Sequence, residues 1–112
     1  MKDFSGKIAV VTGGGSGIGR ELTRQLAEAG CSIAICDVSE EDMAETVEIA
    51  MTAAPQGVKV TAFKADVSNE DQVNAFRDHV REAHDIDHIH LLFNNAGIGG
   101  GSSFVTTPRE SW

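Results

Sequence analysis

The chain has 112 residues and a mass of 11.9 kDa, which fits one folded domain, and its 41% hydrophobic content allows a buried core and excludes intrinsic disorder. The net charge is −8 and no basic cluster occurs, so we expect no nucleic-acid partner. No apolar stretch approaches the roughly 20 residues of a membrane span or forms the core of a signal peptide, so we expect a cytoplasmic protein without membrane contact.

The first third of the chain predicts two strands that flank a helix. Residues 7–12 contain an unbroken apolar, β-branched run that is typical of a strand buried on both faces, and glycines follow it. Apolar residues recur at helical spacing over 17–29, and Gly30 marks the expected end of that helix. A second buried strand is predicted over 32–37.

A second helix is predicted before Pro55. Ser39 and Asp42 are spaced as in a helix cap, which places the start of this helix. Met43 and Met51 lie in its apolar pattern and are expected in the core.

The next elements continue the alternation. Residues 58–64 alternate apolar and polar side chains, as expected of a strand near a sheet edge. Ser68 and Asp71 are spaced as a cap for another helix, and residues 90–94 carry the apolar run of a fourth buried strand.

Strands that alternate with helices require right-handed crossovers and a parallel sheet with helices on both faces. We therefore expect the first half of a doubly wound α/β fold, with about four strands. Thr107, Pro108 and Glu110 form a helix-start signal shortly before the last residue, Trp112. This pattern predicts a single domain over 1–112, truncated at the start of the helix after the fourth strand, in a longer protein.

A glycine-rich loop joins the first strand to the first helix. Its glycines include Gly13, Gly17 and Gly19, a spacing that differs from the G-x-G-x-x-G pattern and from the P-loop. Glycines allow close approach to the backbone, and free amides at a helix N-terminus favour a phosphate group. A plain turn between strand and helix is the alternative.

Asp37 ends the second predicted strand, 18 residues beyond Gly19. A carboxylate at that place accepts hydrogen bonds from the ribose hydroxyls of an adenosine and repels a 2′-phosphate. Because Val38 follows and no Lys or Arg lies nearby in sequence, the residues favour NAD over NADP. The alternative is a solvated loop acid or a helix cap.

Polar segments also follow the third and fourth strands: Asp66-Val67, and Asn94-Asn95 with Ala96-Gly97. Ligands of doubly wound sheets bind at this carboxyl edge. Together with the T-G-x-x-x-G-I-G loop that begins at Thr12 and the acid Asp37, these segments resemble the N-terminal half of the short-chain dehydrogenase/reductase family. The resemblance covers essentially the whole chain and implies a Rossmann-type fold.

The resemblance also implies a role for each matching residue. The glycine loop would hold the pyrophosphate, the acid after the second strand the adenosine ribose, the Asp-Val pair the adenine, and the last segment the nicotinamide ribose. Asn95 would be structural, and hydrogen bonding to backbone at the strand end is the alternative for Asn94. The implied cofactor-binding residues are Gly13, Ser16, Gly17, Ile18, Gly19, Asp37, Asp66, Val67, Asn94, Ala96 and Gly97.

The catalytic groups of that family lie beyond its N-N-A-G segment and include a Tyr-x-x-x-Lys pair. This chain contains no tyrosine, and Ser102, Ser103 and Ser111 come too early to match the catalytic serine. We therefore assign no catalytic residue and expect the 112-residue chain alone to be inactive. The complete protein would transfer hydride between NAD and an alcohol or carbonyl substrate, as a homo-oligomer.

Two alternatives belong to other classes of function. A non-catalytic nucleotide-binding or partner-binding module remains the alternative, although an open edge on the fourth strand argues against it. A methyltransferase is disfavoured by the segment over 94–97. We expect no metal, because His79 and His84 fall on different faces of one predicted helix, and no disulfide, because Cys31 and Cys36 would point to opposite faces of one strand.

Overall fold

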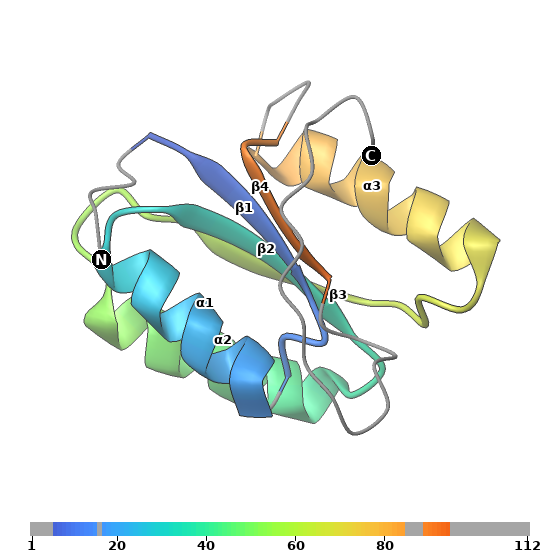
Figure 1. Ribbon diagram of the computed structural model, residues 1–112, viewed down its shortest axis with the longest axis horizontal. Helices are drawn as coiled ribbons and strands as arrows, with labels where there is room; N and C mark the ends of the chain where they lie inside the picture. Colours follow the sequence, from blue (N-terminus) through green and yellow to red (C-terminus); the bar gives the residue numbers. More distant parts are fainter. Residues whose placement is uncertain (1–5, 16, 85–88, 95–112) are drawn as a thin grey trace.

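The structure is a computed structural model that describes residues 6–15, 17–84 and 89–94 of the chain. Strands and helices alternate throughout this part (Figure 1). The elements are β1 (Ile8–Thr12), α1 (Gly17–Glu28), β2 (Ser32–Asp37), α2 (Glu40–Ala53), β3 (Val60–Lys64), α3 (Glu70–His84) and β4 (Leu91–Asn94).

The four strands form one parallel sheet in the order β3-β2-β1-β4. The chain moves outward from β1 to β3 and then returns to place β4 on the other side of β1. The strand order therefore reverses between β1 and β4, which is the point where doubly wound sheets bind their ligands. The predicted fold class is confirmed.

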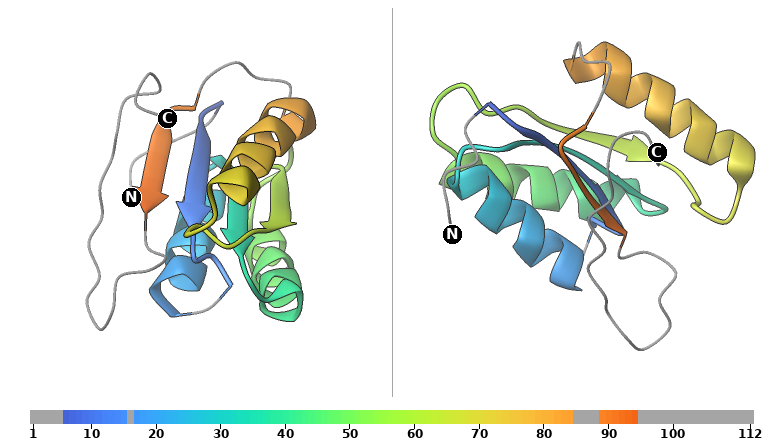
Figure 2. Two further views of the ribbon diagram at one scale, coloured as in Figure 1. Left: turned by 90° about the vertical axis from the view of Figure 1, so that its right-hand side faces the viewer. Right: turned by 45° about the horizontal axis from the view of Figure 1, so that its top comes forward.

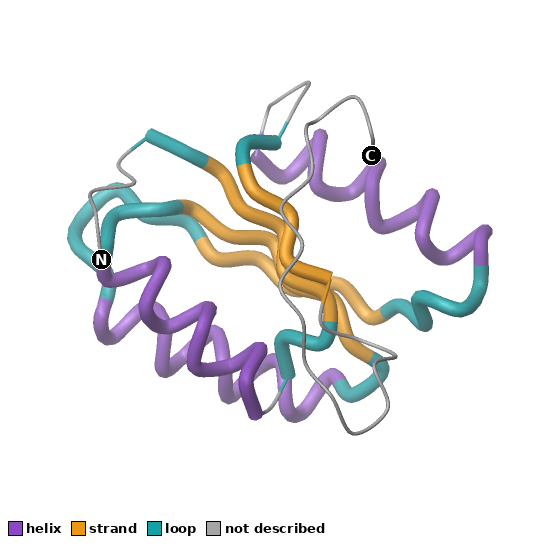
Figure 3. The backbone as a smooth tube through the Cα atoms, viewed as in Figure 1, coloured by secondary structure: helices purple, strands orange, loops and turns teal. Residues whose placement is uncertain are grey.

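Helices cover both faces of the sheet. Figures 1 and 2 show α1 and α2 side by side on one face and α3 on the other, and Figure 3 shows the sheet between these two layers. Along β1, Ala9 and Val11 belong to the core beneath α1 and α2, whereas Ile8 and Val10 belong to the core beneath α3. All four are at most 4% exposed, as predicted for a strand buried on both faces.

The two outer strands of the described sheet are less buried than its centre. β3 pairs with β2 alone among the described strands and exposes Ala62, which confirms its predicted edge position. The predicted burial of the fourth strand is wrong: Leu91, Leu92 and Phe93 are half-buried and Asn94 is exposed. The reason is that β4 also has only one strand neighbour in the described part of the chain.

The cap of α2 is confirmed, and one of its core assignments is not. The Ser39 hydroxyl oxygen accepts a hydrogen bond from the Asp42 N–H at 3.2 Å. Met43 is 2% exposed, as predicted, but Met51 is 44% exposed. Met51 follows the buried Ala50 by one residue, and this step of about 100° along an α-helix turns its side chain away from the sheet.

The start of α3 also differs from the prediction. The Asn69 side-chain oxygen accepts the Gln72 N–H at 3.1 Å, so Asn69 caps the helix. Ser68 instead donates both its N–H and its hydroxyl to Asp66. The inner face of α3 carries the predicted Phe76 and Val80 as buried residues, with Val73 and Ala83 half-buried beside them.

His84, at the end of α3, makes stability depend on pH. Its Nε2 lies 2.7 Å from the Thr61 hydroxyl oxygen on β3. Burial, with the nearby charges of Lys59 and His79, lowers the pKa of His84 to about 4, from an ordinary value of 6.5. The folded protein thus holds a neutral imidazole where the unfolded chain binds a proton, and stability is lost as pH falls from 6.5 towards 4.

We expect the full-length natural protein to lose free energy of unfolding over this pH window and His84→Gln to lose less. Glutamine presents an amide to Thr61 and does not titrate. Urea denaturation of both proteins at several pH values between 4.5 and 6.5 measures the difference, with 6.5 as the ordinary histidine pKa. Equal slopes for the two proteins would contradict the assignment of this proton to His84.

Candidate functional site

The carboxyl ends of all four strands meet at one edge of the sheet. Thr12, the last residue of β1, is in register with Cys36 on β2 and with Asn94 on β4. Asp37 is in register with Lys64, the last residue of β3. The polar residues predicted from separate parts of the sequence therefore share one edge, at the point where the strand order reverses.

The glycine loop runs from the end of β1 across the end of β2. The N–H groups of Gly13 and Gly14 both donate to the Cys36 carbonyl, at 2.8 and 3.2 Å. A Cβ atom on Gly14 would lie 2.6 Å from the Cβ of Ile35, so the loop rests directly on the sheet. Gly14 was not among the predicted site residues, although no larger residue fits there.

The Asp37 carboxylate is held by two backbone amides. One oxygen, Oδ2, accepts the Gly15 N–H at 2.8 Å, and the other, Oδ1, accepts the Val38 N–H at 2.7 Å. Each carboxylate oxygen can accept a further hydrogen bond, so the group can also accept hydrogen bonds from ribose hydroxyls. The approach is so close that a Cβ on Gly15 would lie 2.6 Å from Oδ2. Gly15 is a second glycine that the motif spacing did not identify.

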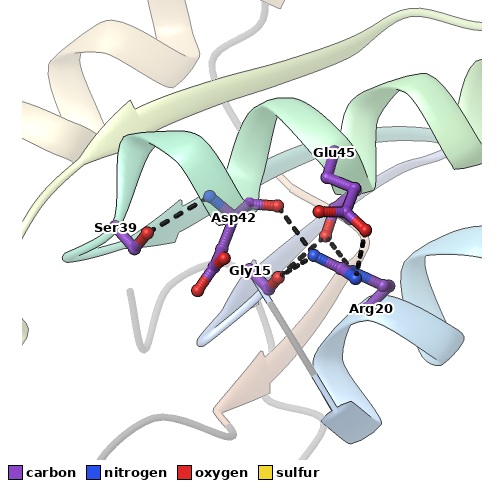
Figure 4. Close-up of polar contacts among 6 residues, drawn as sticks. Gly15, Arg20, Ser39, Asp42 and Glu45 are labelled. Carbon is purple, nitrogen blue, oxygen red and sulfur yellow. Dashed lines mark hydrogen bonds and ion pairs between the residues drawn. The ribbon is translucent and has the colours of Figure 1, made fainter.

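Arg20 connects the glycine loop to α2, and the sequence analysis missed it (Figure 4). Its Nη2 donates to the Gly15 carbonyl at 2.6 Å and to the Asp42 carbonyl at 3.1 Å. Its Nε donates to the Thr46 hydroxyl at 2.9 Å, and its Nη1 pairs with Glu45 at 3.1 Å. Thr46 is the residue that could have indicated this contact, because a polar side chain on the buried face of a helix needs a hydrogen-bond partner.

The residues after β3 form a turn that opens α3. Hydrogen bonds from the hydroxyl and N–H of Ser68 to Asp66 lower the pKa of that exposed carboxyl below its ordinary value, which keeps it ionised. Val67 is half-buried and packs against the core beneath α3. The structure thus places the predicted adenine pair beside the carboxyl edge, with Asp66 toward solvent.

The end of β4 is joined to the end of β1. The Thr12 hydroxyl donates to the Asn94 side-chain oxygen at 3.0 Å. Beside these strands, Ile18 is 46% exposed and lines a groove of about 390 Å³ together with Leu22 and Phe93. Four further residues of the predicted segments lie outside the described residues: Ser16, Asn95, Ala96 and Gly97.

Both cysteines are buried free thiols on opposite faces of the sheet, as predicted, although Cys31 precedes β2. Burial raises the pKa of Cys31 to about 11, and burial with the charge of Asp37 raises that of Cys36 to about 12. Neither is a reactive thiolate at neutral pH.

The described residues, which include His79, His84 and His90, contain no group of three metal-ligating side chains. None of the described helices combines the length and apolar character of a membrane crossing.

Comparison with known proteins places this geometry in a family. The family model for short chain dehydrogenases matches residues 7–112. Epidermal retinol dehydrogenase 2 of Mus musculus is 35% identical over 109 residues, which cover 97% of this chain and 34% of that protein. The crystal structure of levodione reductase matches with a TM-score of 0.79 at 36% identity, covering 89% of this chain and 38% of its own.

A structure with bound cofactor is similar as well. The short chain dehydrogenase/reductase of Burkholderia phymatum, crystallised in complex with NAD, matches with a TM-score of 0.75 at 43% identity. That match covers 88% of this chain and 34% of the Burkholderia chain. The present chain thus spans about a third of the length of the retinol dehydrogenase and of the Burkholderia chain. With a family match along nearly its whole length, the chain belongs to the short-chain dehydrogenase/reductase family.

Proposed function

We propose that this chain is the cofactor-binding part of an oxidoreductase that transfers hydride between NAD and an alcohol or carbonyl substrate. The observation that carries the proposal is the Asp37 carboxylate, fixed by the Gly15 and Val38 amides beside a glycine loop. When bound, NAD would supply the hydride chemistry. The residues of this chain would bind and orient it.

The loop and the end of the sheet suit a dinucleotide. Loop glycines that rest on the sheet let a pyrophosphate approach the backbone closely, and the N-terminus of α1 favours its negative charge. Asp37 would accept the adenosine ribose hydroxyls, and Asp66 with Val67 would flank the adenine. Asn94, tied to Thr12, would lie on the nicotinamide side.

Selectivity for NAD over NADP is the sharper part of the proposal. The Asp37 carboxylate would repel a 2′-phosphate, and its neighbour Val38 is 59% exposed and carries no charge to offset that repulsion. Arg20 contacts the loop as well, and its guanidinium is directed toward the Gly15 carbonyl and Glu45.

Replacement of Asp37 by alanine tests this role in the full-length natural protein. We expect weaker NADH binding and stronger NADPH binding, so that the ratio of the two dissociation constants changes by about 10- to 100-fold, the equivalent of one charged hydrogen bond. Fluorescence titration with both cofactors measures the ratio. Asp78→Ala, an exposed acid on α3, is the matched control. An unchanged ratio in Asp37→Ala would remove Asp37 from this role.

Membership of the family also suggests the substrate class, the oligomeric state and the source of the catalytic residues of the complete protein. Its substrate would be a small alcohol or carbonyl compound, and it would act as a homo-oligomer. Catalysis would use residues outside this chain, which has no tyrosine to serve as the acid or base. The two buried free thiols, Cys31 and Cys36, suit the cytoplasm, where cysteines stay reduced.

A further inference from the structure

Arg20 and Thr46 hold the Gly15 carbonyl from two sides. Arg20 Nη2 donates to that oxygen at 2.6 Å, and the Thr46 hydroxyl lies 3.2 Å from it. The same Thr46 hydroxyl accepts a hydrogen bond from Arg20 Nε at 2.9 Å. Thr46 is fully buried, so its hydrogen bond to the Gly15 carbonyl forms away from water, and the two bonds from Arg20 are partly buried (Figure 4 shows the Arg20 side of the cluster). Bonds in such surroundings are stronger than exposed ones.

Gly15, whose carbonyl Arg20 and Thr46 bind, also donates to the Asp37 carboxylate. Gly15 presents its carbonyl to Arg20 and Thr46, and its N–H to Asp37 Oδ2 at 2.8 Å. A displacement of Gly15 therefore displaces a donor to the Asp37 carboxylate. The clearance is small, because a Cβ on Gly15 would lie within 2.6 Å of that carboxylate and 3.1 Å of the Asp42 side chain.

We infer that Arg20 and Thr46 are positioning residues for cofactor selectivity, acting through Gly15 on the orientation of the Asp37 carboxylate. The inference rests on the proposed function, because it assigns these residues to the same dinucleotide site. The salt bridge of Arg20 with Glu45 is a minor part of the arrangement, since the Glu45 side chain is 61% exposed and exposed ion pairs contribute little.

Arg24 offers a matched comparison on the same helix. It lies one turn after Arg20 and pairs with Glu21 and Glu28, both on α1, instead of with the loop. Loss of Arg24 removes an arginine and its ion pairs but leaves the contacts of Gly15 intact. Any general effect of removing a positive charge from α1 appears in Arg24→Met and can be subtracted.

The test is titration of the full-length natural protein with NADH and with NADPH. The two cofactors differ only at the 2′-position, so a merely destabilised protein loses affinity for both equally. We expect Arg20→Met to lower the preference for NADH by about tenfold, as for one charge-assisted hydrogen bond, and Thr46→Val to lower it by about threefold. Arg24→Met should leave the preference unchanged. In an Asp37→Ala background, Arg20→Met should have no further effect on it.

The outcomes separate this inference from the proposed function. A wild-type protein that binds neither cofactor overturns both. A wild-type protein that binds NADH, with an unchanged preference in Arg20→Met and Thr46→Val, overturns the inference alone. So does an equal loss of both affinities. If Arg20→Met does not fold, Thr46→Val decides, because it keeps the shape of the side chain and removes only the hydroxyl.

Discussion

Replacing Gly19 by alanine should destabilise the protein more than the same change at Gly14, Gly15 or Gly17. Gly19 is buried at the start of α1, and a Cβ there would lie 2.0 Å from the Gly13 carbonyl oxygen. The nearest atoms belong to the loop backbone, so this steric clash can be relieved only if the helix moves away from the loop. We expect a loss of about 3 kcal/mol or more in the free energy of unfolding, as for severe overpacking.

Gly17→Ala is the matched control for this substitution. Gly17 has a φ of +59°, and a Cβ on it would meet no atom within 4 Å. The loss in the free energy of unfolding on its replacement should therefore be limited to the strain of a left-handed backbone conformation, about 1 to 2 kcal/mol. Urea denaturation of the full-length natural protein and both variants measures the two effects. If Gly19→Ala were no more destabilising than Gly17→Ala, close contact between loop and helix would not be the reason for a glycine at 19.

Local patterns were sufficient to predict the order of elements. β1 and β2 carry short apolar runs that are typical of a strand buried on both faces, and both were found within a residue of the predicted bounds. The Ser39 cap depends on residues three apart, and it was also confirmed. The alternation of strand and helix then leaves few topologies, so the parallel sheet and its two helical layers followed.

One error arose from a long-range neighbour, and two arose from local choices that the sequence pattern left open. The apolar run of β4 does not reveal that the strand has a single neighbour in the described sheet. Both Ser68 and Asn69 can cap a helix, and the choice of Asn69 leaves Ser68 to bond with Asp66. Met51 matched an apolar spacing but lies at the margin of the buried face of α2.

The candidate site was predictable in its parts but not in its connections. The glycine loop and Asp37 were identified from spacing, and the structure joins them through the Gly15 N–H. The contact between Arg20 and Thr46 was not predicted, because the two residues are 26 apart in sequence and belong to different helices. Only the packing of α1 against α2 brings their side chains together. Sequence spacing along one element carries no information about such a contact.

Attachment of α3 to the sheet depends on few large side chains. Phe76 is 2% exposed and Val80 is fully buried, and both belong to the core on this face. The Phe76 ring stacks on Phe63 of β3, with 6.0 Å between the ring centroids. Since Asp66 and Val67 lie in the turn that leads into α3, the same contacts also fix one side of the proposed cofactor site.

Phe76→Ala should therefore lower the free energy of unfolding by about 3 to 5 kcal/mol, as for truncation of a fully buried aromatic side chain. Phe63→Ala is the matched control: Phe63 is half-buried on an edge strand, and we expect a loss of about 1 to 2 kcal/mol. Urea denaturation of the full-length natural protein and of both variants gives the two values. Equal losses would mean that Phe76 contributes no more than its stacking partner Phe63, and that Phe76 is not the main anchor of the helix on the sheet.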